Sequence, residues 1–183
     1  TRRSSDLADR QSRQDLDEAV GDCYENLALW HLKHDKDAAA AKAAEAEVVA
    51  NARAIAGAVE PFYGKAASDQ LFGLLAGHWG AISAYLDATR ANSKEEQNEA
   101  FSKLNANAND IATFLAGANP HWPVATLRGL LTAHGAHHVQ QIQQLHAGQF
   151  DAEARTWAAM AEHMNVIADA LAKHKVYVLQ PDA

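Results

Sequence analysis

Apolar residues along this chain recur every three or four positions, which is the spacing of an α-helix that buries one face. One such run leads from Leu71 to Leu86, and another leads from Leu127 to Leu145. Alanine is abundant, runs of β-branched residues are missing, and the chain has 4 prolines. Because this composition favours helix over strand, the sequence predicts an all-α fold.

Cap and turn residues divide the chain into about six predicted helices. Ser93 and Glu96 have the spacing of a capping box, in which each side chain accepts a hydrogen bond from the other residue's backbone amide. Pro123 suits the first turn of a helix, and Asp151 suits an N-cap. The predicted spans are about 5–34, 37–60, 68–92, 93–116, 123–148 and 151–176.

Short links between these spans make successive helices antiparallel neighbours. We therefore expect an antiparallel up-and-down helical bundle. The composition does not change along the chain in a way that would indicate a linker. Residues 1–183 are predicted to form a single domain, with loose ends at 1–4 and 177–183.

The chain also repeats itself with an offset of 56 residues, which indicates a copied helical unit. A leucine followed four residues later by a histidine occurs three times, as Leu27/His31, Leu74/His78 and Leu130/His134. A second repeated position is occupied by Asn51, Asn107 and His163. Since copied units place equivalent side chains in equivalent positions, we expect several histidines to converge inside the bundle.

Histidines on apolar helix faces need partners, because burying an imidazole without one costs on the order of 1–3 kcal/mol. A backbone carbonyl can be that partner, and so can a metal ion. His134 and His138 form H-x-x-x-H, a spacing that places both rings on one face of a helix. The candidate metal ligands are His78, His134, His163, His31 and His138, with His34 as a competitor of His31. Imidazole ligands favour a transition metal ion, with zinc or copper ahead of iron or nickel.

Charge and composition exclude several other classes. The net charge of −7 argues against a nucleic-acid surface. No apolar run approaches the roughly 18 residues of a membrane span, so we expect a soluble protein. The single cysteine, Cys23, excludes a four-cysteine zinc site and an iron–sulfur cluster. The chain starts at Thr1, which leaves open a cytoplasmic protein or a periplasmic or secreted one after signal removal. No protein partner is indicated.

The leading hypothesis is a metal-binding helical bundle with a histidine-rich site between helices. One alternative is an enzyme with one metal ion on His78, His134 and His138 and an open position for water or a thiol. Another is an interaction module without metal, in which an apolar groove binds a partner helix. Joint protonation of the 10 histidines would add pH sensing to any of these.

Two stretches carry a resemblance to known families. The first is Asn107-Ala108-Asn109-Asp110-Ile111-Ala112-x-Phe114-Leu115 with the later Asn119-Pro120-x-Trp122-Pro123 and Leu130-Leu131-x-x-His134. This pattern resembles an uncharacterised family of bacterial and archaeal helical bundles over about residues 25–172. The resemblance implies a bundle with a histidine site formed by His31, His78, His134 and His163, and it implies no established activity.

The second stretch, His134-Gly135-Ala136-His137-His138-x-x-Gln141-Ile142, is similar to the H-G-x-H-H-x-x-Q-I segment of DinB-like four-helix metal proteins. In those proteins an earlier helix supplies a third histidine, and His78 fills that place here. The family includes zinc-dependent thiol transferases, so this resemblance implies a metal-dependent enzyme.

Overall fold

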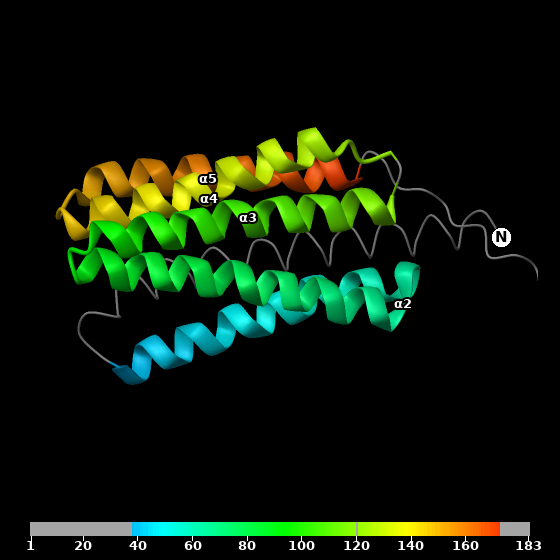
Figure 1. Cartoon of the computed structure of the whole chain (residues 1–183), viewed down its shortest axis with the longest axis horizontal. Helices are drawn as coiled ribbons and strands as arrows, with labels where there is room; N and C mark the ends of the chain where they lie inside the picture. Colours follow the sequence, from blue (N-terminus) through cyan, green and yellow to red (C-terminus); the bar gives the residue numbers. More distant parts are fainter. Residues whose placement is uncertain (1–37, 120, 173–183) are drawn as a thin grey trace, which may run out of the picture.

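The computed structural model describes residues 38–119 and 121–172, which form an antiparallel bundle of four helices (Figure 1). These are α2 (Ala38–Arg90), α3 (Lys94–Ala118), α4 (Val124–His146) and α5 (Phe150–Ala172). Successive helices pack against one another, and α2 also contacts α4. The predicted all-α, up-and-down architecture is confirmed for this part of the chain. The first predicted helix and the predicted loose ends lie outside the described residues.

Helix α2 contains a chain reversal at one residue. Gly64 has φ 80° and ψ 167°, while the residues on either side of it are helical. The two segments of α2 run in opposite directions, as Figure 1 shows in blue to cyan and in green. The sequence predicted a helix end before Pro61, but Pro61 lies inside the helix. Because glycine alone tolerates this backbone conformation, the reversal is placed at Gly64.

The other helix boundaries follow local capping chemistry. The backbone amide of Glu96 donates to Ser93 Oγ at 3.4 Å, which confirms Ser93 as the N-cap of α3. Pro123 is the N-cap of α4 rather than a first-turn residue. Helix α5 begins at Phe150, so Asp151 lies in its first turn instead of capping it. There its carboxylate still interacts favourably with the helix dipole.

Apolar side chains form two clusters along the bundle. We call the first the Leu104 cluster, and its buried members are Val48, Trp79, Ala81, Ile82, Tyr85, Ala100, Leu104, Ile142 and Met160. We call the second the Ile111 cluster, and its buried members are Ile111, Ala112, Leu115, Trp122 and Leu127. Leu74 and Leu131 pack against the Ile111 cluster. On α2 and on α4, the histidines predicted as ligands lie between residues of the two clusters.

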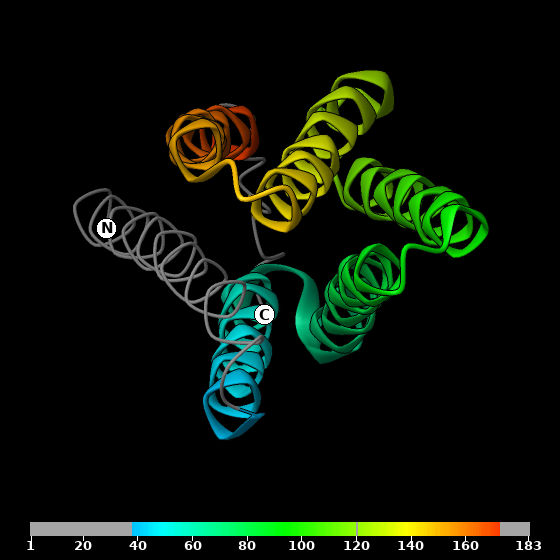
Figure 2. The same ribbon diagram turned by 90° about the vertical axis from the view of Figure 1, so that its left-hand side faces the viewer.

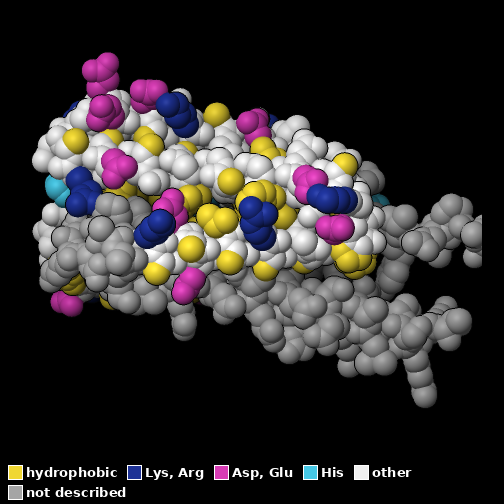
Figure 3. Space-filling view, turned by 90° about the horizontal axis from the view of Figure 1, so that it is seen from below, with side chains coloured by type: hydrophobic (Ala, Val, Ile, Leu, Met, Phe, Trp, Pro, Cys, Tyr) yellow, Lys and Arg dark blue, Asp and Glu magenta, His cyan; other side chains and the backbone are white. Residues whose placement is uncertain are grey.

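Charges of both signs are mixed on the surface that Figure 3 shows, with apolar side chains scattered among them. Among the helices of residues 38–119 and 121–172, none has the length and apolar character needed to cross a lipid bilayer.

The reversal at Gly64 gives a first prediction. Replacement Gly64→Ala should lower the free energy of unfolding by about 1–3 kcal/mol, because a side chain is strained at this φ and ψ. Gly57 is a matched control, since it is helical and a Cβ added there would meet nothing within 4 Å. Gly57→Ala should be neutral or stabilising by up to about 1 kcal/mol. Urea unfolding followed by circular dichroism measures both, and equal effects would contradict the assigned turn.

Candidate metal centre

Three histidines from two helices meet in the interior of the bundle. His78 lies on the second segment of α2, and His134 and His138 lie one turn apart on α4. One ring nitrogen from each histidine lies within 4.8 Å of the other two. Figure 2, which looks along the bundle, shows both helices beside α3. Among the described residues, this is the cluster of histidine, cysteine and acidic side chains compact enough for a metal ion.

The spacing of the ring nitrogens suits coordination of one shared metal ion. The Nε2 atoms of His134 and His138 are 3.1 Å apart. Two imidazole nitrogens on one tetrahedral zinc ion are separated by about 3.3 Å, given zinc–nitrogen bonds of about 2.0–2.1 Å. The ring of His78 stacks on that of His134, with centroids 5.7 Å apart and an interplanar angle of 14°. Because these nitrogens all lie within 4.8 Å of one another, a side-chain movement of at most about 1.5 Å would bring any pair to that spacing.

The histidines lie in a layer that excludes most water. His78 is 9% exposed and His138 is 3% exposed, whereas His134 is half-buried. Burial lowers the pKa of His78. Burial also lowers the pKa of His134, and the neighbouring His78, His163 and His137 lower it further. His78 and His134 are therefore neutral near pH 7, which is the protonation state that metal ligation requires.

Asn107 on α3 determines which nitrogen of His78 carries the proton. Its Nδ2 donates to the carbonyl oxygen of Leu74 at 2.9 Å, so Oδ1 is its remaining acceptor. Nδ1 of His78 is 3.0 Å from this Oδ1 and must donate to it. The neutral ring therefore has its lone pair on Nε2. That atom is buried and has no hydrogen-bond partner among the described residues.

Gly77 leaves the space that Asn107 occupies. A Cβ atom added at Gly77 would lie 3.1 Å from Asn107 Nδ2. The amide would then have to shift, and it is the group that holds His78. The sequence showed Asn107 as a repeated position, but it gave no signal for its contact with His78.

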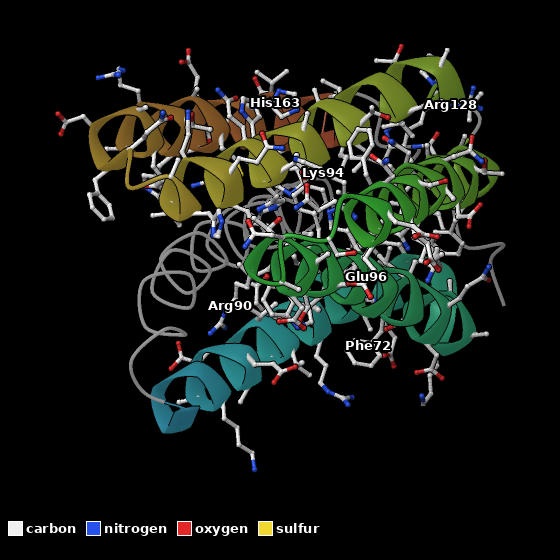
Figure 4. The ribbon with its side chains drawn as sticks, turned by 60° about the vertical axis from the view of Figure 1, so that its left-hand side comes forward. Phe72, Arg90, Lys94, Glu96, Arg128 and His163 are labelled. Carbon is white, nitrogen blue, oxygen red and sulfur yellow. The ribbon has the colours of Figure 1, made fainter. Side chains whose placement is uncertain are left out.

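His163 lies beside the three-histidine cluster and is not part of it. Its Nε2 is 2.8 Å from the carbonyl oxygen of Leu130 on α4, and Figure 4 labels it on the side of α5 next to that helix. Its ring lies 5.5 Å from the ring of His137, centroid to centroid. The sequence-based ligand set thus separates into His78, His134 and His138 together and His163 to one side. His31 and its competitor His34 lie outside the described residues.

No protein-family model, curated protein or solved structure matches this chain. The class of protein is therefore defined by the fold and the site. In its described part, the chain is an antiparallel helical bundle with a three-histidine cluster between helices that is compatible with a metal ion.

The lowered pKa values of His78 and His134 predict how the stability of the metal-free protein depends on pH. Unfolded histidines bind protons with a pKa of about 6.5, and these two folded ones bind them less readily. The free energy of unfolding should therefore be largest above pH 7. It should fall as the pH drops below 6.5, by up to about 1.4 kcal/mol per pH unit for each histidine.

Urea unfolding of chelator-treated protein between pH 7.5 and 5.5 measures this dependence. His134→Gln should flatten the slope, while the control His121→Gln, at an exposed position between α3 and α4, should leave it unchanged. A free energy of unfolding that is the same at both ends of the range would show that the cluster does not resist protonation.

Proposed function

We propose that this protein binds one transition metal ion through His78, His134 and His138. The observation that carries the proposal is the convergence of three imidazole nitrogens within 4.8 Å in the interior of the bundle. Two neighbouring helices supply them, so the site depends on the folded chain. A metal ion bound there would link the second segment of α2 to α4 and stabilise the fold.

The unpartnered nitrogen of His78 supports a metal over a purely hydrogen-bonded cluster. A buried polar atom without a partner costs about 1–3 kcal/mol, and coordination would remove that cost. Nε2 of His78 is such an atom. The hydrogen bond from Nδ1 to Asn107 fixes the tautomer in which Nε2 carries the lone pair, so this atom can bind a metal ion. A hydrogen-bonded layer of rings with every nitrogen satisfied would give no such support.

The ligand set narrows the choice of metal. Imidazole nitrogens suit zinc, copper, nickel and iron, whereas calcium and magnesium require oxygen ligands. Zinc and copper are the leading candidates. Zinc accepts the tetrahedral arrangement that the 3.1 Å separation of His134 Nε2 and His138 Nε2 favours.

Three protein ligands favour an enzyme as the second candidate function. Zinc sites with three protein ligands keep a fourth position for water or substrate, while structural zinc sites are closed by four. A metal in such a site supplies an activated water or polarises a bound group. The likeness of the His134–Ile142 segment to DinB-like proteins supports this alternative. His31 remains the candidate for a fourth protein ligand, which would close the site.

The metal proposal is tested with protein purified without an affinity tag. Equilibrium dialysis against zinc should give one ion per chain for the wild type and none for the double variant His78→Ala/His134→Ala. X-ray absorption of the wild type should show imidazole nitrogens at about 2.0–2.1 Å. His121→Ala is the matched surface control and should retain the ion. Equal zinc content in the wild type and the double variant would refute the proposal.

Cobalt(II) in place of zinc distinguishes an open site from a closed one. If the fourth position is open, a small thiol should change the visible spectrum of the cobalt protein, and His31→Ala should leave the thiol-free spectrum unaltered. If His31 closes the site, the substitution itself should change the spectrum. An open site retains the enzyme alternative, and a closed one excludes it.

A further inference from the structure

Two hydrogen bonds between different helix pairs occur at matching positions. Asn107 on α3 donates to the carbonyl of Leu74 on α2, and His163 on α5 contacts the carbonyl of Leu130 on α4. Both bonds join residues 33 positions apart in the chain. Leu74 to Leu130 and Asn107 to His163 are also both offsets of 56 residues, the offset of the sequence repeat. Asn107 and His163 therefore each contact the backbone carbonyl of the equivalent leucine in their own helix pair.

The donor and acceptor groups of these two side chains match as well. A carbonyl oxygen only accepts, so His163 must carry a hydrogen on Nε2 to bond Leu130. In the neutral ring, Nδ1 then keeps a lone pair. The donor and the acceptor are two bonds apart in the imidazole of His163, as they are in the amide of Asn107. An imidazole of this tautomer can therefore replace an asparagine amide in such a bridge.

Asn107 uses its acceptor to hold His78, and the equivalent of His78 is His134. His134 follows Leu130 by four residues, as His78 follows Leu74. Its Nδ1 is buried and has no hydrogen-bond partner among the described residues. His163 is also close enough to His134 to influence its electrostatics. Nδ1 of His134 thus lacks a hydrogen-bond partner, and Nδ1 of the neighbouring His163 carries a lone pair that can accept a hydrogen bond.

We propose that His163 is a positioning residue: a small shift of its ring would let its Nδ1 accept a hydrogen bond from Nδ1 of His134, the kind of bond that Asn107 already makes with Nδ1 of His78. The hydrogen on Nδ1 leaves the lone pair of His134 on Nε2, the atom that faces His138. The inference rests on the proposed function in so far as that lone pair serves a metal. It assigns His163 a role beside the metal rather than on it.

The proposal also determines which nitrogen of His138 carries its hydrogen in the metal-free cluster. With the lone pair of His134 on Nε2, the 3.1 Å contact requires His138 to donate from its own Nε2. If His138 were to hold a metal ion through Nε2, its hydrogen would have to move to Nδ1 so that the ring stays neutral. Partners of this kind typically change metal affinity 10- to 100-fold when removed, because they hold the ligand ring in one tautomer and orientation.

Substitution at position 163 separates a ligand from a positioning residue. His163→Asn introduces the side chain found at the matching position 107. It should keep zinc affinity within about threefold of the wild type. His163→Leu removes both the donor and the acceptor and should weaken zinc binding about 10- to 100-fold. Asn107→Leu should weaken it to a similar extent, and the surface control His121→Asn should have no effect.

Nitrogen-15 NMR of the metal-free protein gives a readout that does not depend on metal. His134 should be protonated on Nδ1 in the wild type and in His163→Asn, and a mixture of tautomers in His163→Leu. A wild-type His134 protonated on Nε2 would overturn the inference. Loss of zinc in His163→Asn with the expected tautomer at His134 would also overturn it and make His163 a ligand. If the wild type shows the expected tautomer but binds no zinc, the positioning role stands and the proposed metal function fails.

Discussion

The main constraint on the interior of this bundle is the layer of imidazole rings that it has to accommodate between two apolar clusters. His78 and His138 are almost fully buried, and side chains of the Leu104 cluster and of the Ile111 cluster lie on either side of them along the bundle. Rings in such a layer lose their water, so each nitrogen needs a partner from the protein or a ligand. Asn107 bonds Nδ1 of His78, and the Nε2 atoms of His134 and His138 contact each other, whereas Nε2 of His78 and Nδ1 of His134 have no hydrogen-bond partner among the described residues. Both the chemistry of the site and its effect on stability follow from the fact that some buried ring nitrogens have hydrogen-bond partners and others do not.

Much of the fold was predictable because helical periodicity, caps and short links are local signals. Ser93 is the N-cap that the sequence predicted, and α3, α4 and α5 match their predicted spans within a few residues. In this region of α2 the sequence predicted a helix end before Pro61, because proline is a stronger helix breaker than glycine. The actual requirement is one residue with positive φ, and Gly64 meets it.

The site was predictable only in part. Periodicity identified His78 and His134 as inward-facing, and the structure brings them together. It placed His163, at the edge of its helix's apolar stripe, ahead of His138, whereas the structure groups His138 with His78 and His134. That choice depends on how α4 and α5 are rotated relative to each other, and this rotation is set by the packing of whole helices. The contact between Asn107 and His78 was beyond reach for the same reason, since it requires α3 to approach α2 closely beside Gly77.

The electrostatics of the layer bear on what could complete the site. Three neutral imidazoles bring no negative charge, and among the described residues no carboxylate belongs to the cluster. A divalent ion there would keep its full charge in a poorly solvated layer, which is costly. An anionic fourth ligand, such as a thiolate, would offset that charge, whereas a neutral fourth histidine would not. Burial therefore favours an open position that takes up an anion over a site closed by His31. The same argument favours singly charged copper over divalent metals if the position is closed by a neutral group.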